Sequence, residues 1–424
     1  MPETLLDRRT RLLGPNVRLF YHDPLHLVRG KGTWVWDAAG RRYLDCYNNV
    51  PHVGHCHPHV VEAITRQAQT LNTHTRYLHE NILDYVERLT ATFGPQITSA
   101  ILTCTGSEAN DVALRMAQAA TGATGIIATD HTYHGNTAAV SQLSTTMPPI
   151  GGFGGHVRHV PAPDSYRPLG GSPQTHATAF AAAVEAACQS LIASGHGVSG
   201  LILCPAFVNE GFPDLAHGFL TEAIAIVRRH GGVIIADEVQ PGFGRTGPQF
   251  WGHVGAGFAP DIVTMGKPMG NGHPVAAVAT SFEIISAFRR AFRYFNTFGG
   301  NPVSCAAAAA VLDVLKAENL PARAAETGAY LRDGLRKLAE KHSVIGDVRG
   351  QGLAIGAELV SDRASKAPAT ELADRVINAM RAEGVLMGAN GIHYNVLKIR
   401  PPMPFGKVEA DIVLQTLDKV LDGL

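Results

Sequence analysis

Short, uninterrupted apolar segments alternate with amphipathic ones through the middle of this 424-residue chain. In a sheet with one solvent-exposed face, polar and apolar residues alternate along each strand. The apolar segments lack this alternation, so each is expected to be a strand buried on both faces. Helical stretches between them favour parallel strands joined by crossover helices. We therefore expect an α/β domain with a largely parallel sheet. The strand segments are SAILTC, GIIATD, LILCP, GVIIAD, DIVTMG and PVAAVAT, with helices expected at 108–120, 176–194 and 219–230.

The segments around this domain predict a second, smaller one. DIVTMG and PVAAVAT follow each other too closely for a crossover helix, which predicts one antiparallel pair. Residues 144–174 are rich in Gly, Pro and Ser and predict a long surface loop. We interpret residues 1–57 and 311–424 as a small α+β domain made from both termini, and residues 58–310 as the large domain. The flanking elements are a hairpin at 33–46, helices at 58–72, 80–92, 302–317, 321–342 and 408–423, and strands at 353–359 and 396–399.

Composition excludes several classes of partner. Lys and Arg number 36 and Asp and Glu also number 36, which argues against nucleic-acid or anionic-membrane binding. The six cysteines are scattered without a C-x-x-C pair, as is typical of free thiols in a reducing compartment. No apolar run reaches the roughly 20 residues of a membrane span, and the N-terminal segment lacks the apolar core of a secretory signal. We expect a cytoplasmic enzyme.

The first segment that suggests chemistry is ILTCTGSEANDVALRMAQ, residues 101–118. An apolar strand runs into Gly106 and Ser107, and a helix is expected from about Glu108, with Ser107 as a possible cap. The exposed N–H groups and positive end of a helix bind anions, phosphate in particular. The plainer alternative is an ordinary capped turn between a strand and a helix.

Two further apolar segments end in chemically useful residues. GGVIIADE ends in Asp237 and Glu238, and DIVTMGKP places Lys267 just after a buried strand. Ligands bind at the carboxyl ends of strands in open α/β sheets. A desolvated lysine has a lowered pKa and becomes a nucleophile. A solvated acid and a structural lysine are the alternatives, and GKP lacks the Ser or Thr of a phosphate-binding P-loop.

Taken together, a phosphate-binding turn, a buried acid and a lysine at a strand end are what pyridoxal phosphate requires. The chain resembles the class-III, or ω-, aminotransferases of the fold-type-I pyridoxal-phosphate enzymes over nearly its whole length. The resemblance implies a mainly parallel seven-stranded sheet. It rests on GHCHP, GSEAN, YHG, ADEVQPGFGRTG, MGKPMGNGHPV and TFGGNPVSC, in that order. YNNVPHVGHCHP, NTHTRYLHENI, VPAPDSYR and NVLKIRPPM resemble the branch that contains the phospho-lyases of phosphoethanolamine and phosphohydroxylysine.

The resemblance implies a role for each matching residue around the cofactor ring. Lys267 would form the internal aldimine and then move a proton. Asp237 would pair with the pyridinium nitrogen. Val239 and Tyr133 would pack on the two ring faces, and Gln240 would hydrogen-bond the phenolic oxygen.

The resemblance also implies residues for the cofactor phosphate. Gly106 and Ser107 would hold the phosphate of their own subunit, and Thr297 would reach the phosphate of the neighbouring one. That last role implies a homodimer, or a dimer of dimers, with active sites at the interface.

Substrate recognition rests on fewer residues. Arg400 matches the arginine that binds a substrate carboxylate in many family members, with a structural arginine as the alternative. Cys204 stands where family members usually carry a glutamate that can neutralise this arginine, and Glu210 lies six residues further on. Arg76 and Tyr77 are further substrate-binding candidates, although Arg76 could instead cap a helix or belong to an interface.

The expected reaction is transfer of an amino group from an amine or amino acid to a keto acid, by a ping-pong mechanism. The alternative is elimination of phosphate and ammonia from O-phosphoethanolamine or a related amino phosphate. A third, remote hypothesis is a metal-binding protein built on His52, His55, Cys56, His57 and His59. We expect no metal there, because these residues match a family segment beside the active site, and we interpret them as packing and hydrogen-bonding residues.

Overall fold

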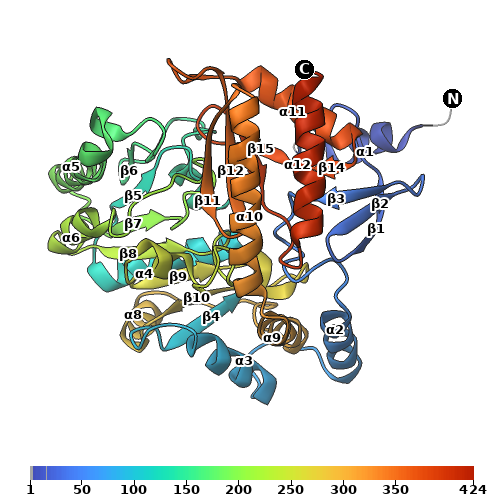
Figure 1. Cartoon of the computed structure of the whole chain (residues 1–424). Helices are drawn as coiled ribbons and strands as arrows, with labels where there is room; N and C mark the ends of the chain where they lie inside the picture. The colour runs from blue at the N-terminus through green and yellow to red at the C-terminus, as the bar shows by residue number, and fades with distance from the viewer. Residues whose placement is uncertain (1–2, 16) are drawn as a thin grey trace.

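The computed structural model describes residues 3–15 and 17–424, and its largest sheet has seven strands in the order β4-β10-β9-β8-β7-β5-β6 (Figure 1). The strands from β9 to β6 are parallel, and β10 is antiparallel to both of its neighbours. This confirms the α/β class and the mainly parallel sheet. The strands are β4 (Ser99–Thr103), β5 (Ile126–Thr129), β6 (Val157–Val160), β7 (Gly200–Leu203), β8 (Val233–Asp237), β9 (Ile262–Met265) and β10 (Ala276–Thr280).

Helices cover both faces of this sheet, which explains why its strands are apolar without alternation. Ile127 of β5 packs with α5 (Pro173–Ala193) and α6 (Thr221–Arg229). Its neighbours Ile126 and Ala128 point to the other face and pack with α4 (Gly106–Thr121) and α8 (Phe282–Ala291). Successive strand residues face opposite sides, so both sets must be apolar.

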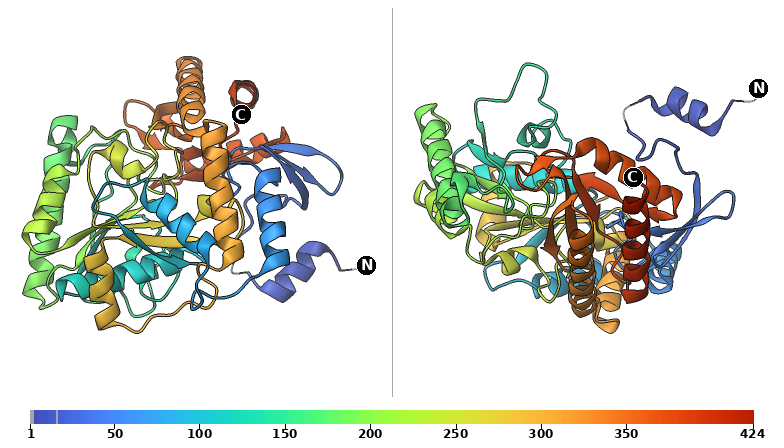
Figure 2. Two further views of the ribbon diagram at one scale, coloured as in Figure 1. Left: turned by 90° about the horizontal axis from the view of Figure 1, so that it is seen from below. Right: turned by 45° about the horizontal axis from the view of Figure 1, so that its top comes forward.

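The segment 144–174 differs from the expected surface loop. Its first part is a loop that projects from the body in the right-hand view of Figure 2, with Met147 and Ile150 exposed. Its second part forms β6, which pairs in parallel with β5 at the edge of the sheet. The sequence VRHV of β6 carries two polar residues, as an edge strand tolerates, so the apolar pattern missed it. The expected antiparallel pair is confirmed, and β10 adds a second one with β4.

A second sheet, antiparallel throughout, lies toward the C-terminus (Figure 1). Its strands are β11 (Ile345–Gln351), β12 (Ala354–Asp362), β16 (Val396–Ile399) and β15 (Gly388–Asn390), with β13 (Ala367–Pro368) on β12. The sequence prediction did not include β11, whose residues IGDVRGQ are largely polar or glycine. The helices here are α10 (Leu320–Lys341), α11 (Thr370–Ala382) and α12 (Lys407–Asp422).

The two ends of the chain meet in a third sheet, of four strands. β1 (Leu27–Lys31), β2 (Trp34–Asp37) and β3 (Arg42–Asp45) form a meander, and β14 (Val385–Leu386) pairs in parallel with β3. This pairing fits a small domain built from both termini. The domain boundaries at residues 57 and 310 stay a prediction, and the second one falls inside α9.

The remaining elements surround this framework. Near the N-terminus, α1 stands apart from the body and buries no residue (Figure 2).

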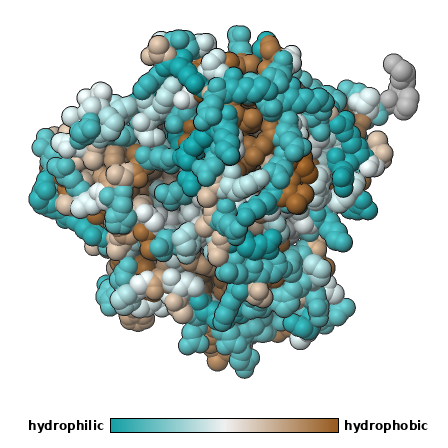
Figure 3. All heavy atoms as spheres, in the orientation of Figure 1, coloured by the Kyte–Doolittle hydropathy of each residue, from teal (hydrophilic) through white to brown (hydrophobic). Residues whose placement is uncertain are grey.

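Hydrophilic side chains cover most of the face seen in Figure 3, with hydrophobic ones showing between them. Among the described residues, no helix combines the length and the apolar character needed to cross a membrane. The elements are α1 (Leu5–Leu13), α2 (Pro58–Thr70), α3 (Glu80–Thr90), α7 (Gly252–Ala256), α9 (Pro302–Ala317) and the 3₁₀ helices η1 (Val140–Leu143), η2 (Leu169–Gly171) and η3 (Lys267–Gly270).

Close backbone packing of α10 generates a prediction about stability. A Cβ atom on Gly328 would lie 2.0 Å from the carbonyl oxygen of Gly352, in the turn between β11 and β12. Backbone cannot give way as a flexible side chain does, so Gly328→Ala should destabilise the protein by about 3 kcal/mol. The measurement is the thermal unfolding midpoint, which should fall by several degrees.

Gly255→Ala is the matched control. Gly255 also lies in a helix, but its added Cβ would meet only the Gln351 side chain, at 3.7 Å. Its unfolding midpoint should stay level or rise slightly, because alanine favours a helix more than glycine does. Equal midpoints for the two variants would contradict the proposed close approach of α10 to the turn.

Candidate active site

A cavity of about 280 Å³ lies at the carboxyl ends of the parallel strands. It brings together most of the residues predicted to bind the cofactor, which lie at the ends of β4, β5, β8 and β9 or in the segments that follow them. Those that line it are Gly106, Ser107, Tyr133, Asp237, Val239, Gln240 and Lys267. This is the edge of the sheet at which open α/β proteins bind ligands.

Asp237 is the last residue of β8 and is held from several sides. Its Oδ2 accepts hydrogen bonds from Nδ1 of His134 at 2.6 Å and from Nδ2 of Asn110 at 2.9 Å. Its Oδ1 accepts from the backbone N–H of Val239 at 3.0 Å. Asn110 is in turn fixed by Thr264, whose hydroxyl donates to its side-chain oxygen at 2.6 Å. The carboxylate is therefore held rigidly at the cavity wall.

The sequence analysis did not assign His134 or Asn110, although both lie in quoted motifs, YHG and GSEAN. Asn110 is fully buried on the apolar face of α4, beside Ala109 and Ala113. A polar residue at such a position must be hydrogen-bonded, and this signal could have indicated a buried partner. His134 directly follows Tyr133, but nothing in the sequence shows that its ring turns toward Asp237.

Lys267 follows β9 and opens η3. Its side chain faces the open cavity, but the protein around its amine excludes most of the bulk water. This desolvation, together with the positive charge of Arg400, lowers the pKa of the Lys267 amine. The uncharged amine is consequently present at lower pH than in a free lysine, which suits a nucleophile.

The turn before α4 forms the end of the cavity suited to an anion. The helix begins at Gly106 and is capped by Thr105, whose hydroxyl accepts from the N–H of Glu108 at 3.1 Å. The expectation of a start near Glu108 with Ser107 as the cap was therefore wrong. Ser107 instead sits in the first turn, where its Oγ accepts from the N–H of Asn136 at 3.2 Å. The first N–H groups of the helix have no carbonyl partner within it and can bind a phosphate.

Val239, Tyr133 and Gln240 line the middle of the cavity. Val239 is buried and lies against Gly106, where an added Cβ would come within 3.0 Å of its Cγ2. Tyr133 is half exposed. The side-chain oxygen of Gln240 accepts a hydrogen bond from the guanidinium of Arg400, which fixes its orientation.

Arg400 lies behind Gln240 and is buried. Burial lowers its pKa to about 10, so it remains charged at neutral pH. Its Nε has no hydrogen-bond partner among the described residues. Cys204, which the resemblance places where a glutamate is usual, lines the cavity as a thiol whose pKa burial raises. Asp45 acts on Arg400 electrostatically, but its carboxylate is paired with His55 at 2.7 Å.

Lys398 is a second buried basic residue, which was not among the predicted site residues. It lies on β16, and Arg400 directly follows that strand. Both side chains approach the ring of Tyr47, at 6.0 and 5.6 Å from its centroid. Burial, followed by the charges of Arg400 and Lys267, lowers the pKa of Lys398 well below its usual value. The two-residue repeat of a strand, which places residues 398 and 400 on one face, could have indicated it.

Four predicted residues do not line this cavity: Arg400, which lies behind Gln240, and three that lie further away. The guanidinium of Arg76 lies 3.9 Å from the ring centroid of Phe295, and Tyr77 stacks on His74 with 5.1 Å between ring centroids. Thr297 is exposed in a surface hollow beside α4. None of the three lines the cavity that holds Lys267 of the same chain.

The histidines of the segment 52–59 do not converge on a common point. Their ring nitrogens bond to four separate partners, at distances typical of ordinary hydrogen bonds. Burial lowers the pKa of His52 to about 3, so it is neutral. The pairs are His52 with the carbonyl of Phe243 (2.9 Å), His55 with Asp45 (2.7 Å), His57 with Glu318 (3.1 Å) and His59 with Asp313 (3.0 Å).

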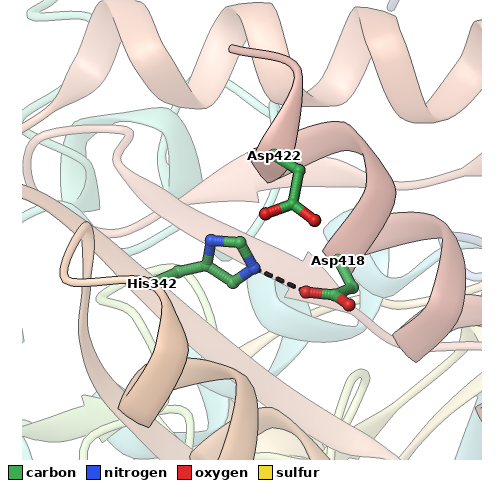
Figure 4. Close-up of side chains that lie close together, drawn as sticks. All are labelled: His342, Asp418 and Asp422. Atoms are coloured by element: carbon green, nitrogen blue, oxygen red, sulfur yellow. Dashed lines mark hydrogen bonds and ion pairs between the residues drawn. The ribbon is translucent and has the colours of Figure 1, made fainter.

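One other group of potential metal ligands is present in the described part of the chain, formed by His342, Asp418 and Asp422 (Figure 4). The ammonium of Lys341 donates to both acids, at 2.8 and 2.7 Å. Lys341 and His342 thus already hydrogen-bond the two acids, and this group is explained as an ion-pair network.

Comparison with known proteins places the chain in a family. The model of the class-III aminotransferases matches residues 20–421, and the chain belongs to that family. An Arabidopsis thaliana protein named alanine–glyoxylate aminotransferase 2 homolog 2, mitochondrial, is 41% identical, with 98% of this chain and 87% of that protein covered. A phospholyase from Arthrobacter, solved in complex with phosphoethanolamine, is 44% identical with a TM-score of 0.96, covering 99% and 100% of the two chains. A pyridoxal-phosphate-bound amine transaminase from an uncultivated Pseudomonas species is 29% identical with a TM-score of 0.87, covering 95% of each.

The protein is therefore an enzyme of the pyridoxal-phosphate-dependent class-III aminotransferase family, as the resemblance had implied. The chemistry of the cavity residues fits this cofactor independently of the comparisons. It offers a desolvated amine on Lys267, a fixed carboxylate on Asp237 and a free helix start at Gly106.

The proposed phosphate site at the start of α4 leads to a prediction about cofactor affinity. Gly135 has φ +140°, and a Cβ there would lie 2.6 Å from Oγ of Ser107. Gly135→Ala should push Ser107 from its place and weaken pyridoxal-phosphate binding about tenfold, the equivalent of 1.4 kcal/mol. The measurement is the Kd for cofactor binding to the apoenzyme, followed by the visible absorption of the bound cofactor.

Gly122→Ala is the control for backbone strain. Gly122 caps the other end of α4 with φ +70°, and an added Cβ would meet nothing within 4 Å. This variant should lose some thermal stability and keep its cofactor affinity. Equal affinities for wild type and Gly135→Ala would contradict the proposed phosphate site.

Proposed function

We propose that this enzyme transfers an amino group between a small amine or amino acid and a keto acid, and that both substrates present an anionic group to Arg400. The observation that carries the proposal is the buried guanidinium of Arg400 near Lys267, which forms no salt bridge among the described residues and feels only the more distant charge of Asp45. A pocket with a permanent positive charge suits two substrates that each bring a carboxylate, because both half-reactions use the same site. The Arabidopsis relative carries an aminotransferase name of this kind.

The cofactor, when bound, supplies an aldehyde for the Lys267 amine and a ring that accepts electrons from the substrate. Asp237 would hold a proton at the ring nitrogen, oriented by His134 and Asn110. Ser107 and the N–H groups at the start of α4 would bind the phosphate.

Lys267 would also serve as the group that moves a proton during the reaction. Because its pKa is lowered, a larger share of its amine is uncharged than in a free lysine, and an uncharged amine can take a proton from the substrate carbon and return it at a neighbouring position. Tyr133 and Val239 would keep the ring between them, and Gln240, oriented by Arg400, would reach its phenolic oxygen. Residues that exclude water on both ring faces favour this proton transfer.

The enzyme is also proposed to act as a homodimer or a dimer of dimers, with Thr297 reaching the cofactor phosphate of the neighbouring subunit. Supporting this, Thr297 is exposed and next to Phe298, which is 70% exposed. Tyr77 and Leu78 are exposed as well, at 66% and 97%. Such apolar exposure favours burial against a partner. In such a dimer, the side chain of Arg76 would reach the active site of the neighbouring subunit.

Two further proposals concern organisation. The chain is proposed to divide into a large domain at residues 58–310 and a small one at residues 1–57 and 311–424, supported by the pairing of β3 with β14. A cytoplasmic location is proposed from the six free cysteines. The name of the Arabidopsis relative instead assigns that protein to the mitochondrion.

A phospho-lyase is the second candidate function. The observation that favours it is the likeness to the Arthrobacter phospholyase bound to phosphoethanolamine, at 44% identity. The charged guanidinium of Arg400, with the buried amine of Lys398 nearby, would also suit a phosphate group. In this reaction Lys267 would take the same proton, after which phosphate would leave from the adjacent carbon, and no keto acid would be needed.

One assay separates the two reactions. The holoenzyme is mixed with O-phosphoethanolamine in the absence of keto acid, and inorganic phosphate is measured. The aminotransferase proposal predicts less than one phosphate per active site and requires loss of the yellow colour with an amine donor, restored by a keto acid. Many turnovers of phosphate release without keto acid would contradict it and support the lyase.

Arg400→Gln provides the control on substrate charge. The variant should raise KM for amines that carry a carboxylate or phosphate by about a hundredfold, since a charge-assisted pair contributes roughly 3 kcal/mol. Its KM for a neutral amine should stay close to that of the wild type. A uniform loss with both kinds of amine would argue that Arg400 is structural.

A further inference from the structure

Arg245, in the motif GFGRTG after β8, is a buried cation that the proposed mechanism does not use. It is 0% exposed, and its guanidinium donates to three neutral acceptors. They are the carbonyl oxygens of Leu353 at 3.0 Å and Pro401 at 2.7 Å, and Nδ1 of His52 at 3.2 Å. Burial, followed by the charge of Arg400, lowers the pKa of Arg245 to about 9, so it stays charged at neutral pH. A buried charge is costly, and these acceptors offset part of that cost.

One of these contacts holds the chain directly after Arg400. Pro401 is the next residue, and its carbonyl oxygen accepts from Nη1 of Arg245. The same nitrogen donates to Leu353, in the turn between β11 and β12, so it ties the two segments together. On the other side, the N–H of Arg400 donates to the carbonyl oxygen of Cys46 at 2.7 Å. The backbone at Arg400 is therefore held from both sides, and one of these contacts depends on the side chain of Arg245.

His52 orients Arg245 and is itself fixed in one tautomer. Its Nε2 lies 2.9 Å from the carbonyl oxygen of Phe243, which can only accept, so Nε2 carries the proton. Its Nδ1 faces a guanidinium, which can only donate, so Nδ1 accepts. The imidazole is consequently neutral, and its main-chain carbonyl also accepts from the N–H of Met403 at 2.8 Å. His52 thus contacts both Arg245 and the chain that follows Arg400.

The loop after β8 contacts Arg400 at two places. The side-chain oxygen of Gln240 accepts from its guanidinium, and Arg245 holds the peptide that follows it. Between them lies Phe243, whose φ of +61° is strained for a bulky residue. Such backbone persists where surrounding contacts determine it, and His52 supplies one of them. Because Gln240 also lines the cavity, this loop relates the position of Arg400 to the cofactor-binding residues.

We propose that Arg245, oriented by neutral His52, is a positioning residue that fixes Arg400 relative to the cofactor and so sets how well the site accepts an anionic group. The planar guanidinium can bind two carbonyls and an imidazole at once, whereas an ammonium lacks this fork. Neither Arg245 nor His52 is among the residues that line the cavity, so both act through Arg400. The inference rests on the proposed role of Arg400 in binding substrate anions.

Loss of this contact has a selective consequence. Without Arg245, the peptide after Arg400 loses its side-chain partner, and the guanidinium of Arg400 is no longer held in one place. An anionic reagent then loses part of a charge-assisted hydrogen bond. A neutral reagent that meets only the cofactor is unaffected.

Two small reagents measure this selectivity without catalytic turnover. Aminooxyacetate and methoxyamine both react with the bound cofactor and bleach its yellow colour, but only aminooxyacetate carries a carboxylate. The second-order rate constant of bleaching is measured for each reagent on the holoenzyme at neutral pH. The ratio of the two constants, which we call the carboxylate preference, reports anion binding by Arg400. Arg400→Gln provides the reference value for a site that lacks this cation.

The test compares the wild type with Arg245→Lys, His52→Leu and His52→Asn. Arg245→Lys keeps the charge and loses the fork, so the carboxylate preference should fall roughly tenfold, with methoxyamine bleaching unchanged. His52→Leu should lower the preference in the same direction. His52→Asn should keep most of it, because an amide oxygen can accept in place of Nδ1.

His176→Leu is the control for loss of a buried histidine. His176 is 5% exposed on α5, where its ring packs on Phe219 with 4.8 Å between ring centroids. It does not line the cavity, and its replacement should leave the carboxylate preference at the wild-type value.

Three outcomes would overturn the inference. They are a wild-type preference in Arg245→Lys, an equal loss of rate with both reagents, and a loss in His52→Asn as large as that in His52→Leu. If Arg245→Lys fails to fold, the two His52 variants still decide. A wild type whose preference is no greater than that of Arg400→Gln would contradict the proposed role of Arg400 itself, and this result is distinct from the other three.

Discussion

The fixed carboxylate of Asp237 is the interaction on which the rest of the site depends. A charged group at the end of a buried strand is stable only when its oxygens have partners. Here the partners come from α4, from the loop after β5 and from its own chain, through Asn110, His134 and the N–H of Val239. Each of these segments also lines the cavity, so satisfying one carboxylate brings the cofactor-binding residues together.

The charge balance of the cavity follows from its burial. Lys267, Lys398 and Arg400 lie close enough for their charges to act on one another, and desolvation lowers the pKa of each. Of these, Arg400 keeps its charge at neutral pH, since its pKa stays near about 10. The thiol of Cys204 does not compensate it. This charge supports the proposal that the substrates bring an anionic group, whether a carboxylate or a phosphate.

The sequence predicted the framework of the fold because buried parallel strands leave a strong pattern. It missed β6 and β11, which carry polar residues and glycines that an apolar pattern does not detect. It identified Lys267 and Asp237 from their places at strand ends, and the structure puts both at one cavity. It did not find His134, because the importance of this residue depends on a contact with Asp237, 103 positions away along the chain. Such contacts have no local signal.

The central claim is that the amine of Lys267, rather than that of the neighbouring Lys398, binds the cofactor covalently. The most direct measurement is borohydride reduction of the holoenzyme, followed by proteolysis and mass spectrometry of the peptides. The account predicts one pyridoxyl group per chain on the peptide that contains Lys267, and none in Lys267→Ala. A pyridoxyl group on Lys398, or no modified peptide from yellow wild-type enzyme, would contradict it.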